Sequence, residues 1–99
     1  MKESKKDRTQ RQHARRSFDA RYGVILTDAV HDELVKQILD GAPILAASGK
    51  YPIFRVEYNM VAMPVAYNRK NGLLITALPV QCLDPKNIGV KTFEHWDTK

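Results

Sequence analysis

The chain has 99 residues, of which 43% are hydrophobic and 27% are charged, and it carries a formal net charge of +5. This length provides one domain with a modest core and is too short for two. The single cysteine, Cys82, excludes an intrachain disulfide and a cysteine-based zinc site. We find no apolar run of membrane-spanning length and no signal-peptide core after the basic start, and therefore expect a cytoplasmic protein that binds no membrane.

The net positive charge comes entirely from the first 22 residues. They hold eight basic and three acidic side chains, whereas residues 23–99 hold eight of each. A basic segment beside a neutral remainder is typical of proteins that bind phosphates or an acidic protein surface, although a solvated terminus has the same composition. We expect residues 1–7 to form a disordered basic tail and residues 8–99 to form a single domain.

Two helices are predicted first. Ala14, Phe18 and Tyr22 recur at i, i+4 and i+8 and indicate a helix that begins near Arg8 and is capped by Gly23. The second helix begins after an N-cap at Thr27 or Asp28 and ends before Gly41 and Pro43. Its apolar stripe comprises Val30, Leu34 and Ile38, widened by Val35 and Leu39.

Alternating apolar residues then predict strands over 53–58 and 61–67, joined by a tight turn at Asn59 and Met60. Pro64 cannot donate a ladder hydrogen bond, so it implies an edge, a bulge or an outward-facing position. The turn from Asn68 to Gly72 leads into a strand over 73–78, which we expect to be central because it is apolar on both faces.

Residues 44–47 are a short strand or part of a loop, residues 84–87 form a turn, and residues 89–96 are a last edge strand or a surface arm. The predicted fold class is α+β, with two N-terminal helices packed on an antiparallel meander sheet of three to four strands. Oligomeric state is not determined by these patterns.

His13 and Arg16 are the strongest candidates for chemistry. They lie three residues apart on the face of the first helix opposite Ala14 and Phe18, so both can contact one ligand. Histidine titrates near neutrality, and a neighbouring cation stabilises a phosphate whose charge grows during reaction. The alternative is that both residues are simply solvent-facing.

Other candidates are weaker. Thr76 is the lone hydroxyl in an apolar strand, and is either a substrate contact or a satisfied strand residue. We expect His31 to be a surface residue, and the aromatic residues Tyr51, Phe93 and Trp96 either stack on bases or pin the terminus. The basic residues predicted to bind nucleic acid or a partner are Arg8, Arg11, Arg15, Arg21 and Lys70.

Nucleotide-binding loops, dinucleotide-binding turns, zinc spacings and nucleophile elbows are absent from the sequence, so we expect no cofactor and no metal. Double-stranded DNA is a weaker candidate ligand, because no helix-turn-helix spacing is evident and the second helix begins with acidic residues.

A basic first helix contains His13 and Ala14 and ends with Arg21 and Gly23; it is followed by a second helix and by a meander containing 65-VAY-67 and 74-LITALP-79. This combination resembles small proteins of phages and mobile elements. These are similar in outline to the ribonuclease toxin superfamily that includes barnase, EndoU, the colicin nuclease domains and RelE. The resemblance covers residues 9–79. It implies metal-independent RNA cleavage in the cytoplasm of a host cell, by attack of a 2′-hydroxyl on the adjacent phosphate.

Carried over by position, the resemblance implies that His13 is the acid or base, that Arg16 or Arg21 binds phosphate, and that Thr76 contacts the substrate. Related sequences tend to have an arginine one helical turn after the histidine, where this chain has Ser17. Two hypotheses follow. The protein is an RNA-acting, endoribonuclease-like toxin, or it is a non-catalytic phage-encoded inhibitor whose basic helix binds a host protein with an acidic surface.

Overall fold

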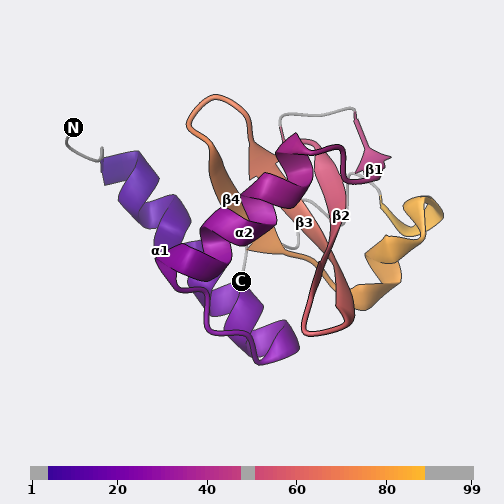
Figure 1. Ribbon diagram of the computed structural model, residues 1–99, viewed down its shortest axis with the longest axis horizontal. Coiled ribbons are helices and arrows are strands. Elements are labelled where there is room, and N and C mark those ends of the chain that lie inside the picture. Colours follow the sequence, from indigo (N-terminus) through magenta and orange to yellow (C-terminus); the bar gives the residue numbers. More distant parts are fainter. Residues whose placement is uncertain (1–4, 48–50, 89–99) are drawn as a thin grey trace.

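The computed structural model describes residues 5–47 and 51–88. Two helices precede a four-stranded antiparallel meander, and two short 3-10 helices follow it (Figure 1). The elements are α1 (Lys5–Tyr22), α2 (Asp28–Leu39), β1 (Ile44–Ala46), β2 (Ile53–Tyr58), β3 (Val61–Asn68), β4 (Leu73–Ala77), η1 (Val80–Leu83) and η2 (Pro85–Asn87). The predicted α+β fold class is confirmed.

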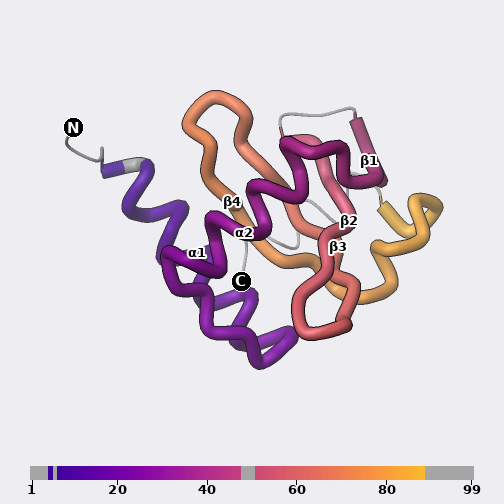
Figure 2. Tube along the Cα trace, in the orientation of Figure 1, coloured from indigo at the N-terminus to yellow at the C-terminus, as the bar shows by residue number. Residues whose placement is uncertain are grey.

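The sheet has the order β1-β2-β3-β4, so each strand pairs with its neighbour in sequence. The tube in Figure 2 follows this path: α2 crosses one face of the sheet, and α1 runs along β4 at its edge. The main core lies between the helices and this face; its larger buried members include Phe18, Leu34, Phe54, Met63 and Leu74. A smaller cluster of Ile53, Ala66, Leu78 and Cys82 lies on the opposite face, where η1 packs.

Helix α1 is held to the sheet by its predicted apolar stripe. Ala14 and Phe18 are fully buried, and Tyr22 packs against the same cluster. Gly23 then has a φ of +63°, which a glycine adopts at little cost and which ends the helix. The helix begins at Lys5, three residues before the expected start. Its first turn contains no apolar residue, so the apolar spacing used for the prediction gave no signal there.

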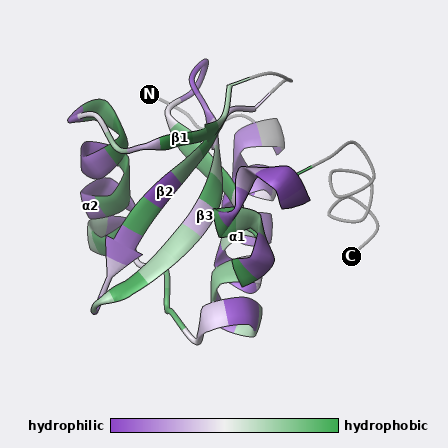
Figure 3. Ribbon diagram, turned by 90° about the vertical axis from the view of Figure 1, so that its right-hand side faces the viewer, coloured by the Kyte–Doolittle hydropathy of each residue, from purple (hydrophilic) through white to green (hydrophobic). Residues whose placement is uncertain are grey.

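Helix α2 begins after Thr27, whose hydroxyl accepts a hydrogen bond from the Val30 N–H at 3.2 Å. The inward stripe is rotated from the predicted one. His31, Leu34 and Ile38 are its buried residues, whereas Leu39 is 71% exposed. The prediction that Leu39 widens the core face is therefore wrong. Figure 3 shows hydrophobic residues in green on both helices as well as on the strands, and β2 alternates between green and purple.

The turn between β2 and β3 is as tight as predicted. Asn59 and Met60 both have positive φ, +52° and +66°, and connect Tyr58 directly to its partner Val61. Pro64 lies in the central strand β3, where its carbonyl accepts a hydrogen bond from Leu78, just beyond the end of β4. Pro64 has no backbone N–H to donate, and β3 tolerates this because the neighbouring strand β4 ends at this point.

Strand β4 is an edge strand, so the expectation that it is central is wrong. Its residues are apolar on both faces because α1 runs along it and η1 lies beyond the opposite face. A register shift at Ile75 separates the pair Ala66–Thr76 from the pair Tyr67–Leu74. The predictions for residues 89–96, including Phe93 and Trp96, lie outside the described residues.

Candidate nucleic-acid interface

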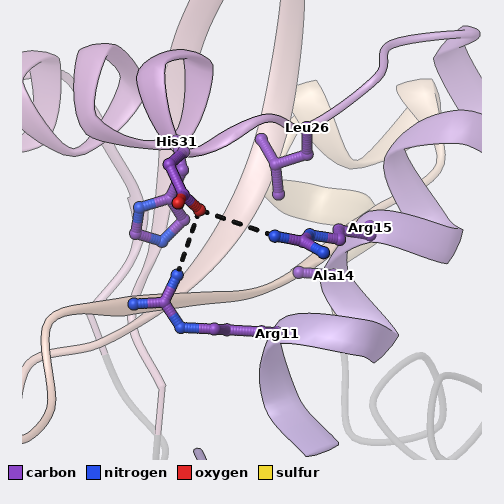
Figure 4. A pocket seen from close by; sticks show the side chains of 6 residues that line it. Arg11, Ala14, Arg15, Leu26 and His31 are labelled. Carbon is purple, nitrogen blue, oxygen red and sulfur yellow. Dashed lines mark hydrogen bonds and ion pairs between the residues drawn. The ribbon is translucent and has the colours of Figure 1, made fainter. Parts of the chain in front are cut away.

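Arg11 and Arg15 lie one turn apart on α1 and face the first residue of α2. The Asp28 Oδ1 atom is 3.6 Å from a guanidinium nitrogen of Arg11 and 3.5 Å from one of Arg15 (Figure 4). The i, i+4 spacing places the two arginines on one side of α1. Two residues predicted to bind nucleic acid or a partner are therefore brought together around a carboxylate of the protein itself.

Behind this carboxylate is a small pocket, and beside it is a larger groove. The pocket has a volume of about 10 Å³ and is lined by Arg11, Ala14, Arg15, Leu26, Asp28 and His31. The groove has a volume of about 450 Å³ and is lined by Arg15, Asp19, Ile25, Leu26, Thr27 and Asp28. Arg15, Leu26 and Asp28 line both, so the pocket and the groove are adjacent.

His31 is buried at the back of the pocket, with 7% of its surface exposed, and the expectation that it lies on the surface is wrong. Its Nε2 accepts a hydrogen bond from the Leu74 N–H at 3.1 Å, and its Nδ1 is 3.5 Å from the carboxylate of Asp32. Burial lowers the pKa of His31, and Arg11 lowers it further, whereas the hydrogen bond to Asp32 and the negative charge of Asp28 oppose the shift. Because the Nε2 atom accepts this hydrogen bond, it carries no proton, and it joins α2 to the edge of β4.

Ser17 is the position at which the resemblance implies an arginine. Its hydroxyl donates to the Ala14 carbonyl at 2.9 Å and accepts from the Ala77 N–H at 2.9 Å. The side chain thus points toward the sheet and satisfies an outward-facing donor of the edge strand. An arginine at this position would face β4 instead of a ligand in solvent.

The other predicted site residues on α1 differ in exposure. Arg8, Arg16 and Arg21 are exposed, and His13 is half-buried. Within the described part of the chain, His13, Arg8 and Arg16 make no hydrogen bond or ion pair through their side chains. The i, i+3 placement of His13 and Arg16 predicted from the sequence is present in the helix.

Lys70 is brought to the N-terminal half of α1 by its neighbour in the β3–β4 turn. The Asn71 side-chain amide donates to Asp7 Oδ1 at 2.9 Å and to Gln10 Oε1 at 2.8 Å. These bonds hold the turn that carries Arg69 and Lys70 against the first half of α1, while the Arg69 guanidinium lies over the Phe54 ring, 5.9 Å from its centre. We call the exposed residues Lys5, Arg8, Arg16, Arg69 and Lys70 the cationic face.

Thr76 is 5% exposed, and its hydroxyl donates to the Ala77 carbonyl at 3.3 Å. It is paired with Ala66, and paired residues of antiparallel strands share a face. Since Ala66 belongs to the smaller cluster, Thr76 lies on the face opposite the main core. The catalytic role of His13, Arg16 and Thr76 remains a prediction, and Thr76 is its least accessible member.

Cys82 is buried in the smaller cluster, and this burial raises the pKa of its thiol, although Arg21 opposes the shift. In residues 5–47 and 51–88, no three histidine, cysteine or acidic side chains gather as metal ligands would. No helix in the same part of the chain is both long and apolar enough to cross a membrane.

The sequence analysis missed His31 and the inward role of Ser17. His31 could have been found from its spacing, since it lies three and seven residues before the buried Leu34 and Ile38. Ser17 gave no such signal, because its role depends on the register of a strand 60 residues later. Comparisons of the chain with protein families, with curated proteins and with solved structures find no match.

Proposed function

We propose that this protein binds single-stranded RNA through the cationic face. The observation that carries the proposal is the joining of two basic segments by Asn71, which bonds to Asp7 and Gln10 and so holds the turn bearing Arg69 and Lys70 against the first half of α1, which bears Arg8. Two arrays of cations from different elements can contact successive phosphates of one strand.

The arrangement favours a single strand over a DNA duplex. A helix that reads duplex DNA projects into the major groove. Here α1 is flanked by α2 on the side of Arg11 and Arg15 and by the β3–β4 turn at its first half. The preference for RNA over DNA comes from the resemblance to ribonuclease toxins and is part of what the experiment tests.

Binding should be measured by fluorescence anisotropy with a single-stranded RNA of about 15 nucleotides and with the DNA of the same sequence. The double variant R8Q/K70Q should bind RNA at least about tenfold more weakly than the wild type. A matched control, K36Q/K86Q, removes two exposed lysines outside the cationic face and should bind within about twofold of the wild type. Equal losses in both double variants would contradict a defined binding face.

Salt dependence provides a second readout. If three to five cations contact phosphates, the logarithm of the binding constant should fall with the logarithm of salt concentration with a slope of about −2 to −3.5. R8Q/K70Q should reduce that slope, and K36Q/K86Q should not. Retention of one host protein from a nuclease-treated lysate, together with no RNA binding, would replace this proposal with the inhibitor hypothesis.

RNA cleavage is a second candidate, favoured by the half-buried His13 beside Arg16. In the implied reaction His13 accepts the proton of a 2′-hydroxyl, the 2′ oxygen bonds to phosphorus as the bond from phosphorus to the 5′ oxygen breaks, and the 5′ oxygen takes a proton from water. The products are a 2′,3′-cyclic phosphate end and a 5′-hydroxyl end. Cleavage that survives EDTA and is abolished in H13Q with RNA binding retained supports this function; unchanged cleavage by H13Q contradicts it.

A further inference from the structure

The side chain between Arg11 and Arg15 is arranged as an anionic ligand would be. One oxygen of Asp28 lies 3.6 Å from the Arg11 guanidinium and 3.5 Å from that of Arg15 (Figure 4). Guanidinium groups bind phosphate oxygens through paired donors, and phosphate offers more oxygens than the single carboxylate oxygen shared here. Asp28 thus occupies a position that suits a phosphate.

The Asp28 carboxylate is easily displaced from the two arginines. Both distances exceed the 2.7–2.9 Å typical of charge-assisted hydrogen bonds. The Asp28 side chain is 79% exposed, and exposed ion pairs contribute little to stability.

The groove next to Arg15 has the size and character needed for the remainder of a nucleotide. Its volume of about 450 Å³ falls within the range of small-molecule sites, about 300–1,000 Å³. Ile25, which is 76% exposed, provides an apolar wall for one face of a base. The carboxylate of Asp19 on the same groove can accept hydrogen bonds from ribose hydroxyls and would repel a second phosphate.

We propose that Arg11 and Arg15 bind the phosphate of one nucleotide unit, that the groove accepts its nucleoside, and that Asp28 occupies the phosphate position in the free protein. The unit is a free mononucleotide or one residue of an RNA strand. In the second case the inference deepens the proposed function, because the site adds a nucleotide pocket beside the cationic face. Asp28 is then a competitor that each ligand must displace.

The test is titration of the full chain with 5′-AMP, adenosine and the dinucleotide ApA, followed by NMR chemical shifts and calorimetry. D28N removes the competing charge and should bind 5′-AMP about fivefold more tightly than the wild type, whereas R15Q should bind it about tenfold more weakly. Adenosine should give no measurable binding at the same concentrations. Shifted amide signals should fall on residues 25–28 and on Arg15.

Matched control variants distinguish binding at a defined site from general electrostatic attraction. E33Q makes the same charge change as D28N elsewhere on α2, and R55Q removes a guanidinium that pairs with Glu57 at 3.0 Å in β2. Both should bind 5′-AMP within about twofold of the wild type. The proposal is overturned if D28N binds no more tightly than the wild type, or if R55Q loses as much affinity as R15Q.

The ligands also identify the source of the phosphate. Comparable affinities for ApA and 5′-AMP indicate a residue of an RNA strand, and binding of 5′-AMP alone indicates a free mononucleotide. If long RNA does not bind to the cationic face but 5′-AMP binds as predicted, the proposed function fails and the nucleotide site stands. If RNA binds but D28N changes nothing, the nucleotide site fails alone.

Discussion

The imidazole Nε2 of His31 accepts a hydrogen bond from the backbone N–H of Leu74, 3.1 Å away, and so ties α2 to the outer edge of β4. An Nε2 atom that accepts must be unprotonated. Protonation of His31 and docking of α2 on β4 therefore oppose each other, with Asp32, Asp28 and Arg11 as the charged groups around the ring.

This opposition predicts a loss of stability in mild acid. Because burial lowers the folded-state pKa of His31 below its ordinary value of about 6.5, the unfolded chain binds the proton more readily. The stabilisation is complete above the unfolded-state pKa and is lost as the pH falls through the folded-state pKa. Urea unfolding at several pH values between 8 and 5, a range chosen to span about that reference value, measures this effect.

The matched variants are H31Q and H13Q. H31Q should lower the free energy of unfolding at pH 8 by about 1–3 kcal/mol and should remove most of the dependence on pH in this range. H13Q removes a histidine that makes no hydrogen bond among the described residues and should retain that dependence. A wild-type protein whose stability is constant from pH 8 to pH 5 contradicts the assignment.

Ser17 should be a stability determinant despite its place on a polar helix. S17A removes the acceptor of the Ala77 N–H and leaves an edge-strand donor without its partner, which should cost about 1–3 kcal/mol of unfolding free energy. T9A removes a hydroxyl that bonds only locally to the Lys5 carbonyl and should change stability by less than about 0.5 kcal/mol. Thermal and urea unfolding of the two variants provide the comparison.

Replacement of Met60 by glycine should stabilise the protein. Met60 has a φ of +66° and is 98% exposed, so the residue bears the strain of a left-handed conformation without contributing to packing. M60G should raise the free energy of unfolding by about 0.5–1 kcal/mol, since glycine adopts positive φ freely but loses more entropy on folding. M60V should have the opposite effect, because β-branched residues tolerate this conformation poorly. Equal stability of the two variants would show that the turn is not strained at this position.

Tyr22 links the end of α1 to the residue after β4. Its hydroxyl donates to the Leu78 carbonyl, and burial raises the pKa of the phenol while Arg21 opposes the shift. Y22F should lose about 1 kcal/mol of stability. In the wild type, this contribution is complete below the unfolded-state pKa of about 10 and is lost as the pH rises through the folded-state pKa. Absorbance titration of the tyrosines should show one late phase that is missing in Y22F.

Local sequence patterns were sufficient to predict the helices and the hairpins. The spacing of Ala14, Phe18 and Tyr22 predicted the inward side of α1, and the turns at 59–60 and 68–72 predicted the meander. These features depend on residues close together in sequence, for which helical and strand periods are directly visible.

The edge position of β4 and the burial of His31 could not be predicted in the same way. An apolar strand is typical of a sheet centre, and a sequence cannot show that α1 runs along the outer edge instead of another strand. The flanking acids of His31 suggested a solvent-exposed helix start, whereas its true partner, Leu74, is 43 residues away. The pairing of Arg11 and Arg15 with Asp28 likewise depends on how α1 and α2 cross.

Side chains from the helices cover the open edges of the sheet much as an additional strand would. His31 and Ser17 accept from β4, and Gln37 both donates to the Glu57 carbonyl at 2.7 Å and accepts from the Glu57 N–H at 2.9 Å, beyond the end of β1. Unpaired strand edges are templates for intermolecular pairing. Undocking of the helices would expose these strand edges, so conditions that protonate His31 should promote self-association.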